Sequence, residues 1–386
     1  MFSRRLPPHA DLNALTQALV RRRLEGAAVI DLTESNPTRA GIAYPPDLLR
    51  GLADRPALRY DPQPCGLPSA RAAVAADHAR RGVTVDPRHV VLTASTSEAY
   101  TWLFKLLCNP GESVLVPRPS YPLFEHLTRL ESICAAPYDL EYHGRWEIDF
   151  GAISAAPQEV RAVIVVSPNN PTGSFITSRD IERLSMLCRE RGWALIADEV
   201  FVDYPLETDA PLTDLAVRSH VLAFTLGGLS KSVGLPQLKL GWIVAGGPAA
   251  ARDAALAGLE LIADSFLSVG TPVQAALPDL LDRGAAVRGH IHARVRENLR
   301  ALRGLARSFS ACEVLRTEGG WSGVIRVPAT RTEEQLVLDL LEHEGILVHP
   351  GYFFDLAREA FIVVSLLPEP DAFAHASARL LQLASS

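Results

Sequence analysis

Lys231 lies where a lysine amine could act as a nucleophile. It follows the apolar run Val221–Phe224 and enters a loop rich in Gly and Pro that extends to Trp242. A lysine between a strand and such a loop is shielded from water, and low polarity lowers the pKa of an amine and frees its lone pair. The amine could then form an imine with an aldehyde. One lysine is a weak signal by itself, but motifs upstream in the chain strengthen it.

A hydroxyl-rich loop follows the predicted strand Val90–Leu92. Ser95, Thr96 and Ser97 open a predicted helix there, where free N–H groups and the helix dipole favour an anion. Taken alone, these residues are more typical of an ordinary helix N-cap. Tyr121 follows the next predicted strand and could stack on a planar ring, although an aromatic residue at such a position is more often simply packed.

Two further loops present an amide and a carboxylate. Asn170 lies in the turn Ser167–Gly173, and its side-chain amide can donate to a phenolate oxygen. Asp198 ends the apolar run Ala194–Ala197, where a carboxylate is costly unless it meets a cation. A protonated pyridine nitrogen would be such a cation, and a helix N-cap is the alternative. Because ligands collect at the carboxyl ends of parallel strands, we expect these loops to form one site.

Short β-rich runs alternate with helical segments in the middle of the chain, which predicts a mostly parallel sheet with helices on both faces. The predicted strands are Val90–Leu92, Ser113–Val116, Val163–Val166, Ala194–Ala197, Val221–Phe224 and Trp242–Val244, and the predicted helices are 97–108, 121–130, 178–191 and 249–259. A long helical stretch over about 273–309 leads to further strands near 314–315, 323–327 and 361–366, with helices near 332–344 and 370–384.

Composition narrows the class of protein. The chain has 386 residues, of which 48% are hydrophobic and 21% charged, as is ordinary for a globular protein. A net charge of -6 argues against a nucleic-acid partner. No run of about 18 apolar residues indicates a membrane span, and the N-terminus lacks the apolar stretch of a signal peptide. The five scattered cysteines form no metal-binding pattern and favour a reducing cytoplasm.

Taken in chain order, these motifs resemble those of the fold type I pyridoxal-phosphate enzymes, specifically the class I/II aminotransferase family. The resemblance runs from about residue 30 to the end of the chain. It implies an α/β fold with a mostly parallel seven-stranded sheet flanked by helices and a smaller α+β domain built from both chain ends. The expected divisions are an N-terminal arm with part of the small domain (1–45), the large cofactor-binding domain (46–275), an interdomain helix (276–310) and the rest of the small domain (311–386).

The resemblance also assigns roles around pyridoxal 5′-phosphate. Lys231 would form the imine with the cofactor and shuttle the Cα proton, Asp198 would pair with the pyridine N–H⁺, and Tyr121 would stack on the ring. Asn170 would contact the phenolic oxygen of the ring. The expected phosphate contacts are Ser95, Thr96, Ser97, Ser230, Lys239 and Tyr60, of which Tyr60 would reach the site of a neighbouring subunit. That last role implies a homodimer with shared active sites.

Substrate recognition departs from the family pattern. Relatives carry an arginine for the substrate carboxylate where this chain has Val363, and such a contact contributes about 3–6 kcal/mol. Phe201 and Lys239 are milder departures, from a tyrosine and an arginine respectively. The candidate cations are Arg358, Arg326 and Arg118. The expected substrate residues are Asn36, Asn170, Trp321, Tyr352 and Arg358.

The leading hypothesis is therefore a pyridoxal-phosphate-dependent aminotransferase that moves an amino group between an amino acid, or a related amine, and a 2-oxo acid. A lyase, cyclase or decarboxylase that uses the same lysine chemistry is the alternative. A regulatory or binding protein that keeps the fold without turnover is a third hypothesis, and the complete set of Lys231, Asp198 and Asn170 argues against it. The donor, the acceptor and the pathway stay open at this point.

Overall fold

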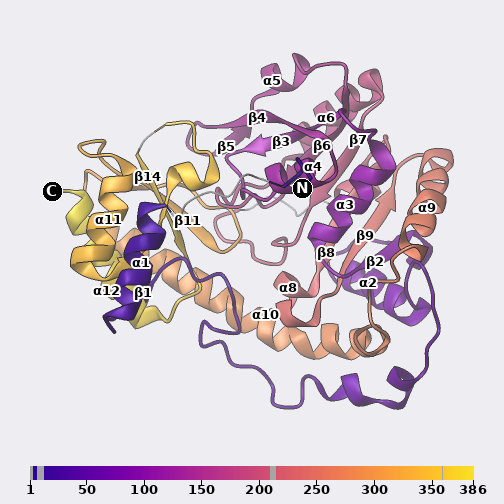
Figure 1. Cartoon of the computed structure of the whole chain (residues 1–386), viewed down its shortest axis with the longest axis horizontal. Coiled ribbons are helices and arrows are strands. Elements are labelled where there is room, and N and C mark those ends of the chain that lie inside the picture. The colour runs from indigo at the N-terminus through magenta and orange to yellow at the C-terminus, as the bar shows by residue number, and fades with distance from the viewer. Residues whose placement is uncertain (1–2, 7–12, 209–213, 359) are drawn as a thin grey trace.

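The computed structural model describes residues 3–6, 13–208, 214–358 and 360–386, and Figure 1 shows a large sheet-based domain beside a smaller one. The large sheet has eight strands. In spatial order they are β2 (Val90–Thr93), β9 (Gly241–Gly246), β8 (Ala223–Gly228), β7 (Ala194–Asp198), β6 (Val160–Val166), β3 (Ser113–Arg118), β4 (Cys134–Tyr142) and β5 (Trp146–Ile148). The run from β8 to β4 is parallel, whereas β9 and β5 pair antiparallel with their neighbours.

The sheet contains the six strands that the sequence predicts and two that it does not. Strand β4 lies near one edge, and most of its residues are exposed or half-buried, so it lacks the apolar run that marks the central strands. Strand β5 spans three residues at the edge itself. The expectation of seven strands is therefore one short, because an edge strand is stabilised by its partner more than by its own composition.

Alternate residues of the central strands are buried on opposite faces of the sheet. In β6, Ala162 and Ile164 pack into one apolar cluster, whereas Val163 and Val165 pack into another. The first cluster is covered by α3 (Thr96–Leu107), α4 (Phe124–Leu130) and α9 (Ala249–Asp264), and the second by α5 (Phe150–Ser154), α6 (Ser178–Arg191) and α7 (Leu215–Arg218). This two-sided burial explains why the strands read as continuous apolar runs.

Both ends of the chain build the small domain. Strand β1 (Ile30–Asp31) pairs in parallel with β12 (Ile346–Leu347), and a four-stranded sheet has the order β10 (Glu313–Val314), β11 (Ser322–Arg326), β14 (Phe361–Ser365) and β13 (His349–Pro350). Its helices are α1 (Ala14–Leu24), α11 (Glu333–Glu344) and α12 (Pro370–Ala384). Apart from the long helix described next, the elements not yet placed belong to either domain. They are the helices α2 (Pro68–Arg80) and α8 (Leu229–Ser232), and the 3₁₀ turns Arg50–Ala53, Arg55–Leu58, Pro87–His89, Pro236–Leu238 and Gly351–Phe354.

One long helix joins the two domains. Helix α10 (Thr271–Ala306) packs against α2 of the large domain and against α12 of the small domain (Figure 1). It begins earlier than the predicted interdomain helix because Pro272 occupies the first turn, where a missing N–H costs nothing. The domain boundaries given above remain a prediction. Among the described residues, no helix has the length and apolar character needed to cross a membrane.

Candidate active site

A cavity of about 380 Å³ opens at the carboxyl ends of the parallel strands. Val166, Asp198 and Gly228, the last residues of β6, β7 and β8, all line it, as does Tyr121 after β3. Residues of the small domain close the opposite side. The loops that the sequence singles out therefore meet at one place, as the position of a ligand site in a parallel sheet predicts.

Lys231 reaches this cavity from the short helix α8. Its Nζ lies 4.7 Å from the ring centroid of Trp321 and 5.3 Å from that of Phe201. Burial lowers the pKa of the Lys231 amine to about 8, and the nearby charge of Asp198 opposes part of that shift. About a tenth of the amine is therefore uncharged at pH 7, far more than for an ordinary lysine, and a nucleophilic or proton-accepting lysine requires this uncharged form.

Asp198 carries the buried carboxyl group of the site. Its Oδ2 accepts a hydrogen bond from Tyr100 (3.0 Å) and its Oδ1 accepts one from the backbone N–H of Val200 (3.1 Å). Burial raises the pKa of Asp198 to about 6, although both hydrogen bonds and the charge of Lys231 act to lower it. Such a carboxyl group is poised to ionise when a cation is placed beside it.

Tyr100 is a site residue that the sequence analysis missed. It lies one turn inside α3, is almost fully buried, and contacts Phe104 and Phe124 as well as Asp198. Burial raises the pKa of the Tyr100 hydroxyl well above its usual value, so it remains a donor. No local motif marks this residue, because only the packing of α3 on the sheet brings it to the end of β7.

One end of the cavity is suited to an anion. Ser95 is the N-cap of α3 and its Oγ accepts a hydrogen bond from Glu98 N (3.2 Å). Thr96 and Ser97 in the first turn also line the cavity, as do Ser230 and Lys239. Hydroxyl groups, the start of a helix and one ammonium group thus line the same cavity, which is the combination that binds phosphate in many proteins.

Asn170 and Tyr121 complete the part of the cavity that lies on the large domain. Asn170 lines it, and its Oδ1 accepts a hydrogen bond from Ser322 Oγ (3.3 Å) across the domain boundary. Tyr121 is 49% exposed and also lines it. A side chain so exposed in a cavity wall is free to contact a ligand, which favours the stacking role over the simple packing that was the alternative.

The side of the cavity formed by the small domain is lined by apolar side chains and by uncharged polar ones. Trp321 and Val363 line it, and the Val363 side chain is buried at the position where the resemblance to the family predicts an arginine. His349, which pairs with Val363 in the small sheet, also lines it, and burial lowers the pKa of its imidazole to about 4. This end is also lined by Thr33, Ser35, Ser322, Phe354 and Ser365. Apart from His349, the acidic and basic side chains among the described lining residues are those of Asp198, Lys231 and Lys239.

Three expected substrate residues do not line the cavity. Asn36 turns its Oδ1 to the N–H of Thr38 (3.1 Å), and its neighbour Ser35 lines the cavity instead. Tyr352 is 46% exposed, and Arg358 is also exposed outside the cavity. The sequence analysis chose these residues by position in the chain, and the turns that carry them direct the side chains elsewhere.

The other two candidate cations are engaged in ion pairs outside the cavity. Arg118 holds Asp139 through two hydrogen bonds of 2.6 and 3.0 Å. Arg326 contacts Glu313 at 2.9 Å on the neighbouring strand. The suggestion that Arg358, Arg326 or Arg118 replaces the missing arginine therefore finds no support in the cavity of this chain.

Comparison with known proteins agrees with this arrangement. The family profile described as aminotransferase class I and II matches residues 27–373. The glutamate-pyruvate aminotransferase AlaA of Haemophilus influenzae is 25% identical over 382 residues, which cover 95% of this chain and 93% of that protein. The S-alkyl-thiohydroximate lyase SUR1 of Arabidopsis thaliana is 30% identical over 230 residues, 58% of this chain and 49% of that protein. A mutant aspartate aminotransferase of Thermus thermophilus superimposes with a TM-score of 0.85 over 99% of both chains at 22% identity, which shows a shared fold.

The raised pKa of Asp198 predicts that the free energy of unfolding of the cofactor-free protein falls as the pH rises. A carboxyl group whose pKa is about 6 when folded, against an ordinary 3.8, contributes stability at low pH that is lost as the pH rises through about 6. We expect Asp198→Asn to gain about 2 kcal/mol of unfolding free energy relative to wild type between pH 4 and pH 7, since one pKa unit is worth about 1.4 kcal/mol and part of the shift lies below pH 4. Urea denaturation of both proteins across this range measures the difference.

The control for this prediction is Asp86→Asn. The hydrogen bond from Arg88 holds the pKa of the half-buried Asp86 carboxyl below its usual range. The exchange should therefore have the opposite sign, with a small loss of stability at neutral pH. If the stability of wild type and of Asp198→Asn depended on pH in the same way, the assignment of a destabilising buried carboxyl group at the end of β7 would be contradicted.

Proposed function

The chain belongs to the aminotransferase class I and II family, and from this premise we propose that its cavity binds pyridoxal 5′-phosphate at Lys231 and moves an amino group between an amino donor and a 2-oxo acid. The observation that carries the proposal is the presence of Lys231 and Asp198 in one cavity, next to a hydroxyl-rich helix start. Family membership gives the reaction class, and the geometry supports the assignment of residues.

The residues that line the cavity match the chemical groups of this cofactor one by one. A pyridine N–H⁺ would supply the cation that the buried Asp198 carboxyl needs, and an aldehyde would meet the partly uncharged amine of Lys231. The hydroxyl groups of Ser95, Thr96, Ser97 and Ser230, with the ammonium group of Lys239, would hold the phosphate. Asn170 and Tyr121 would contact the phenolic oxygen and the ring face respectively.

The chain's own residues have distinct tasks in this mechanism. The bound cofactor supplies an aldehyde for the amine and a ring that accepts electrons from the substrate Cα. Lys231 Nζ can take the Cα proton and return it, because a pKa of about 8 populates both of its forms near neutral pH. Trp321 and Phe201 cover Nζ with aromatic surface and limit its contact with water. Asp198 keeps a charge that balances the ring nitrogen.

A lyase is the second candidate, favoured by the missing arginine at Val363 and by the similarity to a plant enzyme named as a lyase. Both reactions begin with removal of the same Cα proton. They differ in what leaves: transamination passes the amino group to an acceptor, whereas elimination releases a leaving group, ammonia and a keto acid without one.

The first experiment tests the reaction and the lysine together. Wild-type protein loaded with pyridoxal 5′-phosphate is mixed with a donor panel that includes glutamate and alanine, and cofactor absorbance and keto-acid product are followed. We expect conversion by wild type and a loss of at least about 10²-fold in Lys231→Ala, since a positioned general base contributes that much.

Two results decide between the candidates. Borohydride should fix the cofactor on Lys231, as located by peptide mass spectrometry, and Lys105→Met is the control that keeps this attachment, because Lys105 pairs with Glu131 and does not line the cavity. Release of ammonia without an acceptor would favour the lyase. The panel therefore also contains a donor with a leaving group on Cβ, and a loaded wild-type protein that converts none of the donors would contradict both candidates.

The neutral end of the cavity leads to a prediction for donor preference. Val363→Arg should raise kcat/KM for a donor with an α-carboxylate, relative to the same amine without it, by about tenfold or more, because a charge-assisted pair adds at least 1.5 kcal/mol. Alanine and isopropylamine form one such pair of donors. Val363→Met is the control of similar length without charge, and an equal gain in that variant would show that side-chain bulk, not charge, is responsible.

We further propose a homodimer in which Tyr60 enters the partner's site. Tyr60 is 77% exposed and shares a surface recess with Trp102 and Leu267, and Trp102 stacks on the exposed Phe266. Leu58, nearby in the chain, is also exposed. Apolar side chains gathered on a surface in this way indicate a protein contact, and Tyr60 itself does not line the cavity of its own chain.

Mixed dimers test whether Tyr60 acts across the interface. Lys231→Ala and Tyr60→Phe chains with different affinity tags are co-expressed, and the hybrid carrying both tags is isolated. If Tyr60 serves the partner's cavity, the hybrid has one intact site, and its turnover should be about half that of wild type. If Tyr60 serves its own chain, the hybrid should be no more active than the average of the two parents. Light scattering of the wild-type protein checks the dimer mass.

A reducing cytoplasm is the location that we propose. All five cysteines are unpaired in the structure. Burial raises the pKa of the Cys188 thiol to about 12 and that of Cys108 to about 11, so neither is a reactive thiolate at neutral pH. Unpaired thiols of this kind are typical of a compartment that does not form disulfides.

A further inference from the structure

The helix that carries Lys231 is too short for its backbone carbonyl groups to find hydrogen-bond partners within it. Helix α8 spans four residues, Leu229–Ser232, and the last carbonyl groups of any helix have no partner within it. Within the segment, Ser232 Oγ donates to Gly228 O (3.0 Å). Gly228 precedes the helix, and Gly234 follows it at a φ of +65°. Flexible residues therefore flank the turn from which Lys231 extends.

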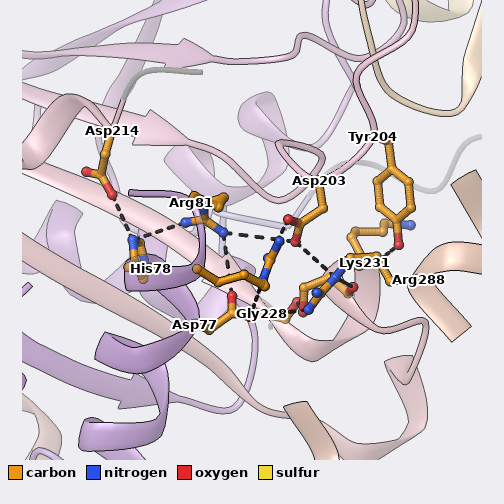
Figure 2. Close-up of polar contacts among 11 residues, drawn as sticks. Asp77, His78, Arg81, Asp203, Tyr204, Asp214, Gly228, Lys231 and Arg288 are labelled. Atoms are coloured by element: carbon orange, nitrogen blue, oxygen red, sulfur yellow. Dashed lines mark hydrogen bonds and ion pairs between the residues drawn. The ribbon is translucent and has the colours of Figure 1, made fainter. Parts of the chain in front are cut away.

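Three side chains from distant parts of the chain donate to these carbonyl groups. Tyr204, in the segment after β7, donates its hydroxyl to Lys231 O. Arg288 of α10 donates Nε to Ser232 O at 2.8 Å. Tyr44, from the segment before α2, donates its hydroxyl to Gly234 O at 2.6 Å. Neighbouring carbonyl groups of one loop are thus held from three directions, and Figure 2 shows Tyr204 and Arg288 on either side of Lys231.

Arg288 is itself held by two buried carboxylates. Its Nη2 lies 3.2 Å from Asp77 Oδ1 and its Nε lies 3.4 Å from Asp203 Oδ2. Arg80 also pairs with both Asp77 and Asp203. Burial alone would raise the pKa of Asp77, but Arg80 and Arg288 hold it below its usual value. The guanidinium group of Arg288 is therefore fixed between charges that are costly to separate.

The network extends away from the cavity through α2. Arg81 lies within 3.5 Å of Asp77 and within hydrogen-bond distance of His78 (3.0 Å), and His78 Nδ1 contacts Asp214 at 2.7 Å. Figure 2 shows this continuous row of polar contacts, which ends behind the loop of Lys231. Arg80, Arg81 and Arg288 pair with Asp77 and Asp203, and His78 links Arg81 to Asp214.

We propose that Tyr204, Arg288 and Tyr44 are positioning residues for Lys231, and that the buried ion network behind Arg288 keeps this clamp rigid. The proposal rests on the proposed function, because it concerns the geometry of the same amine. The three side chains donate to backbone carbonyl groups and do not line the cavity. The clamp fixes the Cα from which the flexible side chain starts, and a misplacement of about 1 Å at a reacting atom can reduce a rate about 10²-fold.

Tyr204→Phe is the cleanest test. The exchange removes one hydroxyl and keeps the ring that packs edge-on against Trp321 at 5.1 Å. Tyr138→Phe is a matched control, because Tyr138 is equally buried and donates its hydroxyl to a backbone carbonyl, Ile164 O at 2.8 Å, away from the Lys231 loop. The two variants should lose similar thermal stability, so that any further difference reports on Lys231.

The readout in the cofactor-free protein is the pH profile of Lys231 labelling by an amine-reactive reagent, followed by peptide mass spectrometry. Burial between Phe201 and Trp321 lowers the pKa of the Lys231 amine, and Asp198 is the charged group that acts on it. A loosened loop should admit water and raise that pKa, which moves the Tyr204→Phe profile to higher pH. The Tyr138→Phe profile should match wild type.

The loaded protein gives the second readout. We expect kcat to fall about 10- to 100-fold in Tyr204→Phe with KM little changed, and to stay near wild type in Tyr138→Phe. Tyr44→Phe should shift the labelling profile in the same direction, and it replaces Tyr204→Phe if that variant does not fold. Identical labelling profiles in wild type and both clamp variants would overturn the proposal. A wild-type protein that binds no cofactor would overturn the proposed function instead, and the labelling experiment would still decide the role of the clamp.

Discussion

Burial of one amine and one carboxyl group in the same cavity is the constraint on which the rest of this structure depends. Lack of water lowers the pKa of Lys231 to about 8 and raises that of Asp198 to about 6, so both groups titrate close to neutral pH. Neither environment stabilises the empty protein. Groups held in this way are typical of functional sites, where the cost of burial is offset by a ligand that brings the missing charge.

The fold meets this constraint by placing the two residues at the ends of adjacent strands and supporting each from behind. Asp198 ends β7 and is held by Tyr100 from α3, whereas Lys231 follows β8 and is held through its backbone by Tyr204 and Arg288. The supporting groups come from elements on both sides of the sheet and from the interdomain helix.

The two ends of the cavity divide the work of recognition. Hydroxyl and ammonium groups at the start of α3 suit a phosphate, whereas Val363, Trp321 and a neutral His349 leave the far end without a positive charge among the described residues. Under the proposed function, this difference concerns the part of the cavity that would face the substrate and leaves Lys231 and Asp198 in place. Substrate choice is accordingly the property that the resemblance to relatives predicts least well.

The sequence by itself determined the family, the central strands and the residues that stand at strand ends. Lys231, Asp198, Asn170 and Tyr121 are readable because a polar residue after an apolar strand has a fixed position relative to the sheet edge. Strand β4, the edge strand β5, and the supporting contacts of Tyr100, Tyr204 and Arg288 were decided only by the tertiary structure. The hydrogen-bond partners of Tyr100, Tyr204 and Arg288 lie between 27 and 98 residues away in the chain. Such long-range contacts leave no local sequence pattern. Side-chain direction in irregular turns, which takes Asn36, Tyr352 and Arg358 out of the cavity, depends on the same long-range packing.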